Sequence, residues 1–115
     1  MKVSFEGIGE NIVTFYNSKT SGAAAGAPVK MSGVCEVANC ADGERFFGVA
    51  VAGDTEFAAV QVEGYVELPY SGAEPAVGFG KLAANGAGGV KAAEAGGEFL
   101  IIDVDTTNKV VGFML

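Results

Sequence analysis

Two aspartates in the stretch FLIIDVDTT, residues 99–107, offer the most suggestive chemistry in this chain. Asp103 and Asp105 follow an apolar run, and such a pair after a strand is typical of phosphotransferases in which a carboxylate attacks phosphorus. These enzymes also need a later basic residue and further acids for Mg²⁺, whereas the residues after Asp105 include one lysine and no acid. We therefore interpret both aspartates as solvated residues beside a turn, with weak cation binding as the alternative.

A second motif, GFGKLA at residues 78–83, imitates the GxGxxA fingerprint of dinucleotide-binding proteins. That fingerprint works by opening a helix whose N-terminus meets the pyrophosphate. Here the glycine-rich stretch NGAGG, residues 85–89, would break such a helix almost at once. The sequence therefore predicts no nucleotide site, and it predicts no other cofactor.

The two thiols, Cys35 and Cys40, have no histidine in the chain to activate them. The nearby carboxylates of Glu36 and Asp42 would raise a thiol pKa rather than lower it. A zinc site needs about four ligands, usually cysteine and histidine, so no metal site is predicted. We expect both cysteines to be reduced core or loop residues rather than a disulfide.

Carboxylates and aromatic side chains remain as candidate functional groups. Glu63 and Glu67 suit acid/base chemistry, although their spacing is equally typical of the solvated face of a strand. Tyr65, Tyr70 and Phe79 lie near predicted turns, where aromatic residues serve either as interface contacts or as caps of the core. No catalytic, cofactor-binding or metal-ligating residue is predicted, and we expect no enzymatic activity.

The elements that position these residues are predicted to be strands in an all-β fold, a small antiparallel sandwich or partly open barrel. The 18 glycines do not suit long helices. Residues 59–68 alternate between apolar and polar as a half-buried strand does. One hairpin is expected from residues 47–51 through a turn at 53–55 into a strand that opens at Phe57, and a second hairpin is expected over 99–115. Placing Phe46 over Phe99, 53 residues later, aligns the two hairpins as a degenerate internal repeat.

The 115 residues are predicted to form one β domain, residues 29–115, preceded by an N-terminal arm or strand pair, residues 1–17. Residues 18–28 are small and rich in glycine and alanine, which indicates a flexible linker. The alternative is that they form a loop between two strands of one sheet. In the first case residues 1–17 would pack on a partner instead of on their own core.

Charge and hydropathy limit the partners that we expect. Seven basic against fourteen acidic residues give a net charge of -7 and a pI near 4.4, which disfavours nucleic-acid binding. The apolar runs are too short to span a membrane. Glu6 and Glu10 fall where a signal peptide would need apolar residues, so we expect cytoplasmic synthesis.

The order of strands and glycines resembles small capsid-associated proteins of tailed phages and prophages, of the head-decoration type. The segments that carry the resemblance are 47–51, 59–72, 75–78, 82–86 and 110–115, within residues 29–115. The resemblance implies a glycine- and alanine-rich β domain with an extended N-terminal arm on the outside of the capsid. It implies the major capsid protein lattice as partner, a homotrimer by analogy, and a final location on the virion.

The leading hypothesis is therefore a structural protein that decorates or stabilises a phage head. The alternative is a small ligand- or carbohydrate-binding β module without catalysis, which would use Tyr65, Tyr70 and nearby acids. Neither hypothesis needs a metal or cofactor.

Overall fold

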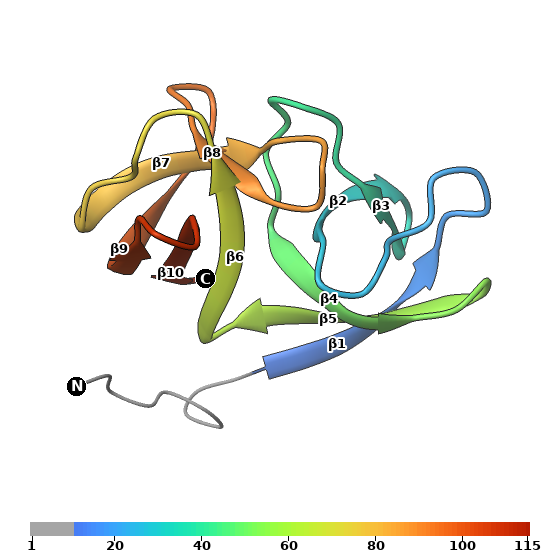
Figure 1. The fold of residues 1–115 in the computed structure, drawn as a ribbon. Helices are drawn as coiled ribbons and strands as arrows, with labels where there is room; N and C mark the ends of the chain where they lie inside the picture. The colour runs from blue at the N-terminus through green and yellow to red at the C-terminus, as the bar shows by residue number, and fades with distance from the viewer. Residues whose placement is uncertain (1–10) are drawn as a thin grey trace.

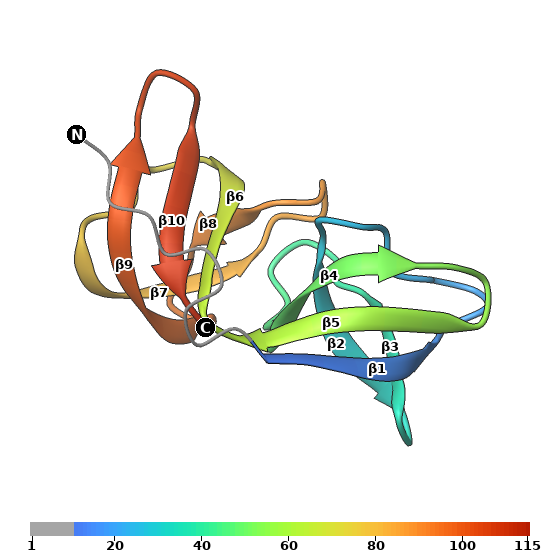
Figure 2. The same cartoon turned by 90° about the horizontal axis from the view of Figure 1, so that it is seen from below.

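The computed structural model of this chain describes residues 11–115, which form two closed five-stranded barrels side by side (Figures 1 and 2). The first barrel contains β1 (Asn11–Asn17), β2 (Pro28–Gly33), β3 (Glu36–Asn39), β4 (Gly48–Gly53) and β5 (Phe57–Glu63). The second contains β6 (Tyr65–Ser71), β7 (Gly78–Ala84), β8 (Val90–Ala92), β9 (Gly97–Asp105) and β10 (Val110–Met114). The predicted all-β fold is confirmed. Over residues 11–115 there is no helix long and apolar enough to cross a membrane.

The two barrels have the same topology. Around the first barrel the strands follow the order β1, β3, β2, β4, β5, and around the second β6, β8, β7, β9, β10. Only one pair in each barrel is parallel, β1 with β3 and β6 with β8. The second half of the chain therefore repeats the architecture of the first.

A β-bulge recurs at the same place in both barrels. In the first, Ala50 faces Val60 and Ala52 faces Ala59, which leaves Val51 as the extra residue. In the second, Gly112 faces Asp103 and Phe113 faces Ile101, which leaves Ile102 as the extra residue. Val60 and Phe113 occupy equivalent positions next to the two bulges, and they are 53 residues apart, the offset suggested by the sequence. The extra residues themselves, Val51 and Ile102, are 51 residues apart. The repeat is structural, and its offset changes from strand to strand.

One glycine divides the chain into its two barrels. The alternating stretch 59–68, predicted to be a single strand, is split at Gly64 into the ends of β5 and β6. Gly64 has a φ of +102°, a conformation that residues with a Cβ rarely adopt. Beside it the buried side chain of Gln61 donates to the carbonyls of Glu63 and Tyr65. The amide thereby fixes the corner between the barrels.

Two consecutive phenylalanines in the β3–β4 loop are shared between the two cores. Phe46 is buried in the core of the second barrel, where its ring stacks on Phe99 and contacts Phe113 edge to face. Phe47 packs against the core of the first barrel and contacts Phe15. The barrels are therefore joined by apolar packing as well as by the chain.

The cores differ in the size of their side chains. The second contains ten buried residues: Phe46, Val49, Val66, Leu68, Tyr70, Leu82, Val90, Ile101, Val111 and Phe113. The first is built from smaller residues: Ala23, Val29, Val37, Ala50, Ala58 and Val60. Because burial stabilises roughly in proportion to apolar area, the second core contributes more to folding.

The sequence did not decide whether residues 1–17 form an arm or pair with the rest of the chain. The described part of this segment, residues 11–17, is a strand of the first barrel. β1 pairs antiparallel with β5 and parallel with β3. Residues 18–28 therefore connect β1 to β2 within one barrel. They form the loop between two strands of one sheet that was predicted as the alternative to a flexible linker. The single β domain predicted over residues 29–115 instead contains most of the first barrel and the whole second barrel, with the change from one to the other at Gly64. Residues 1–10 of the expected arm lie outside the described residues.

Candidate interaction surface

Four side chains form a continuous row across the outer face of the second barrel. Tyr65 on β6 faces Met114 on β10, which faces Leu100 on β9, which in turn faces Phe79 on β7. The neighbouring residues Phe113 and Ile101 are buried, as the alternation of a strand requires. We call Tyr65, Met114, Leu100 and Phe79 the apolar row.

Exposure along the apolar row increases toward β7. Tyr65 and Met114 are half-buried, Leu100 is 39% exposed and Phe79 is 77% exposed. Val77, just before β7, is 67% exposed. We call Val77, Phe79 and Leu100 the exposed patch. Single exposed apolar residues are ordinary, whereas exposed apolar residues that adjoin one another form a candidate interaction surface.

Charged residues flank the exposed patch on one side. Lys81 faces Glu98 across β7 and β9, and its ammonium lies 3.9 Å from the carboxylate of Glu94. These three side chains and Phe79 border a shallow depression of about 440 Å³. An apolar centre with a polar rim is the usual anatomy of a protein–protein contact.

The opposite flank of the apolar row is acidic. Gly112 on β10 faces both Glu67 and Asp103, and the ring of Tyr65 lies over the space that a Cβ at Gly112 would occupy. The Tyr65 hydroxyl donates to Glu67 over 2.9 Å. Burial, and then the carboxylates of Glu67 and Asp103, raise the pKa of Tyr65 well above its ordinary value of 10. Tyr65 therefore stays a neutral hydrogen-bond donor.

Asp105, the second residue of the suggestive aspartate pair, builds a turn. Its Oδ1 accepts the backbone N–H groups of Thr107 and Asn108, two and three residues later. Asp54 does the same for Glu56 and Phe57 at the matching turn of the first barrel. Because this role recurs at equivalent turns, the aspartate is explained by local backbone geometry.

The GFGKLA motif lies within β7, so the structure places no helix after its glycines. Leu82 and Ala83 from this motif are buried in the barrel. Phe79, its aromatic residue, is instead the most exposed member of the apolar row. The stretch therefore contributes a surface side chain rather than a phosphate-binding turn.

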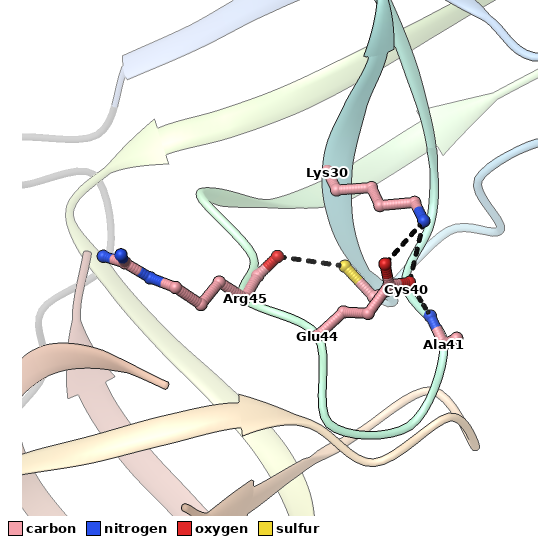
Figure 3. A network of polar contacts seen from close by, with 5 residues as sticks. All are labelled: Lys30, Cys40, Ala41, Glu44 and Arg45. Carbon is pink, nitrogen blue, oxygen red and sulfur yellow. Dashed lines mark hydrogen bonds and ion pairs between the residues drawn. The ribbon is translucent and has the colours of Figure 1, made fainter. Parts of the chain in front are cut away.

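The two thiols are free and lie in different surroundings. Cys35 is exposed at the β2–β3 turn, whereas Cys40 is half-buried and its Sγ donates to the Arg45 carbonyl (Figure 3). Burial, with a smaller contribution from Glu44, raises the pKa of Cys40 from 9.0 to about 11. The Cys40 thiol is thus a weak nucleophile at neutral pH.

Beside Cys40 a charged pair holds the loop that leads to Phe46. The Lys30 ammonium lies 2.8 Å from both oxygens of Glu44, which also accepts the Ala41 N–H (Figure 3). The hydrogen bond from Lys30, and to a smaller extent the one from the Ala41 N–H, lower the pKa of Glu44 below its ordinary value of 4.5. The pair has a structural role, since it orders a loop between two barrels.

The loop also binds directly to the second barrel. The Gly43 N–H donates to the Ala84 carbonyl, and the Ala84 N–H donates to the Glu44 carbonyl. Asp42 forms an ion pair of 2.9 Å with Lys91 on β8. The relative position of the barrels is therefore set by hydrogen bonds as well as by Phe46.

The remaining candidate residues do not form one site. Tyr70 is buried on the inner face of β6, whereas Tyr65 lies on the outer face, so the two do not make a shared stacking platform. Glu63 accepts a hydrogen bond from Asn11 and lies on a different barrel from Glu67. Within residues 11–115, no three acidic or cysteine side chains are grouped so as to hold a metal ion.

Sequence reasoning missed Val77, Leu100 and Met114 as surface residues. The signal was present in the run FLII, which is apolar on both faces of a strand, whereas an ordinary outer strand alternates.

Comparison with known proteins adds no relative to this description. A scan against protein-family models and a search of curated proteins found no match to this chain.

Proposed function

We propose that this chain is a non-catalytic structural protein that decorates the head of a phage or prophage. Its exposed patch would dock on the outer surface of the major capsid protein lattice. The observation that carries the proposal is the pairing of Phe79 with Leu100 across β7 and β9, both of which are exposed. Val77, two residues before Phe79 in the chain, is exposed as well.

The rigidity of the exposed patch supports this role. Its residues belong to or adjoin a closed barrel with a well-filled core, so few degrees of freedom are lost when a partner covers them. Burying a phenylalanine or leucine side chain contributes about 1.5–3 kcal/mol. Many identical copies on one shell would turn a modest contact into stable coverage of the lattice.

The acidic character of the chain is compatible with a place on the capsid exterior. With a net charge of -7 the protein is not built to neutralise packaged nucleic acid. The resemblance to head-decoration proteins, carried by residues 29–115, supports the same role.

Co-sedimentation with capsids of the phage or prophage that encodes the chain tests the proposal. Saturable binding at a fixed ratio to the major capsid protein is expected. If the protein does not bind to mature or expanded shells, the decoration role is excluded. Thermal stabilisation by a small molecule or sugar, without capsid binding, would instead favour a ligand-binding module.

A further inference from the structure

An open groove lies at the end of the first barrel remote from the second. It has a volume of about 1100 Å³ and is lined by the end of β1, the loop that follows it, the start of β3 and the β4–β5 turn. Figure 1 shows these segments together at one end of the first barrel. No residue of the apolar row lines it. We call it the distal groove.

One buried amide connects the segments that line the distal groove. The Asn17 side chain is 6% exposed; it accepts the Ala23 N–H over 2.7 Å and donates to the Asp54 carbonyl over 2.9 Å. This residue thereby ties β1, the following loop and the β4–β5 turn together. The groove is preformed, which limits the entropy lost when a ligand binds.

An exposed aromatic pair stands at the edge of the groove. The rings of Tyr16 and Phe57 stack with centroids 5.5 Å apart and planes 25° from parallel, and they are 54% and 42% exposed. Tyr16 itself lines the groove. A flat ring at the edge of a cleft offers its π face to a cation or another planar group.

Charge selects the kind of ligand that suits this ring. The charged side chains lining the groove are Glu36, Asp54, Glu56 and Lys19, three acidic and one basic. Hydrogen bonds from the N–H groups of Phe57 and Glu56 lower the pKa of Asp54. The groove therefore favours a cation. A second copy of this groove, with the same charges, would be repelled.

We propose that the distal groove binds an arginine-bearing peptide segment of a partner protein. The planar guanidinium stacks on Tyr16 and forms hydrogen bonds with the surrounding carboxylates. Arginine fits better than lysine, because its planar group both stacks on an aromatic ring and pairs with carboxylates through two N–H groups. This inference does not depend on capsid binding, since the groove and the exposed patch lie on different barrels.

The test is an NMR titration of the ¹⁵N-labelled full chain with the peptide acetyl-Gly-Arg-Gly-Arg-Gly-amide. We expect saturable shifts at the amides of residues 16–20, 36 and 54–57, and weaker binding by the lysine peptide. A glutamine peptide of the same length should not bind. Absence of saturable shifts up to millimolar peptide would overturn the proposal. So would shifts spread evenly over all acidic residues, which indicate unspecific attraction.

Variants separate the ring from the charges. Tyr16→Ala should weaken binding roughly threefold to fivefold, and Tyr16→Phe should retain it. Lys19→Gln, which removes the basic side chain from the lining, should strengthen binding, and Glu56→Gln should weaken it. The matched control Phe79→Ser, on the other barrel, should have no effect. Equal binding by the wild type, Tyr16→Ala and Glu56→Gln would refute the site, and folding of each variant is read from the same spectra.

Two other occupants give different results. Shifts at the groove caused by a neutral oligosaccharide but not by the arginine peptide would assign the site to carbohydrate and overturn the proposal. Concentration-dependent shifts at the groove without any ligand would assign it to a second copy of the chain, with the same consequence.

Discussion

The ring of Phe46, from the first half of the chain, stacks on Phe99 of the second barrel with centroids 5.0 Å apart and planes 13° from parallel. Phe46 is 5% exposed and belongs to the second core. The β8–β9 connection, which occupies the equivalent place in the second barrel, consists of residues 93–96 and has no phenylalanine. The first half of the chain therefore completes the core of the second barrel, which depends on this contact for stability.

The Phe46→Ala variant should lose about 3–5 kcal/mol of unfolding free energy, because it leaves a cavity in the larger core. Denaturant unfolding measures this loss. Phe57→Ala, at a 42% exposed position, is the matched control and should lose about 1 kcal/mol. A loss below about 1 kcal/mol for Phe46→Ala would show that the barrels are stable without this contact.

Gly112→Ala should lose about 1–3 kcal/mol, because the new Cβ would overlap the ring and hydroxyl of Tyr65. The double variant with Tyr65→Ala tests the cause. Gly112→Ala should cost less in the Tyr65→Ala background than in the wild type, as a double-mutant cycle measures. Equal costs in both backgrounds would mean that Tyr65 is not the obstacle.

The two cysteines should differ in reactivity. At pH 8 one thiol per native chain should react rapidly with a disulfide reagent, since Cys35 is exposed and the pKa of Cys40 is raised to about 11. Both should react in denaturant, and Cys35→Ser should abolish the rapid phase. Two rapid thiols in the native protein would contradict the half-buried position of Cys40 and its raised pKa.

The pair between Lys30 and Glu44 should make stability depend on acidic pH. The folded pKa of Glu44 lies below its ordinary value of 4.5, so its contribution is complete above pH 4.5 and is lost as the pH falls through the folded pKa. Melting temperatures of the wild type and Glu44→Gln should therefore converge as the pH is lowered below 4.5. A constant difference over that range would argue against the pair.

The sequence predicted the hairpins well because each is local. The β4–β5 hairpin has its turn after Gly53 and its second strand from Phe57, as predicted, and the paired residues of β9 and β10 lie inside the predicted span 99–115. In both hairpins the alternation and the turn residues coincide. Barrel closure was not predicted, since it rests on pairs such as β1 with β5 that are distant in the chain. The role of Gly64 was hidden because the apolar alternation runs through it.

The surface residues were harder to predict than the strands. Phe79 lies between two glycines, so its neighbours gave no indication of which face it would occupy. Tyr70 follows the inward alternation of Val66 and Leu68 and is buried, so of the two roles left open for it, interface contact and cap of the core, the structure shows the second. Asp105 suggested a catalytic role because an aspartate that forms a turn and an aspartate that acts as a nucleophile can both stand at the end of a strand.

The most direct test of the docking surface is co-sedimentation of two matched variants with capsids. Phe79→Ser removes the most exposed side chain of the apolar row, and Val34→Ser removes an apolar side chain that is 93% exposed on the first barrel. Phe79→Ser should weaken binding roughly tenfold or more, and Val34→Ser should bind as the wild type does. Equal binding by both variants would show that the exposed patch is not the contact with the shell.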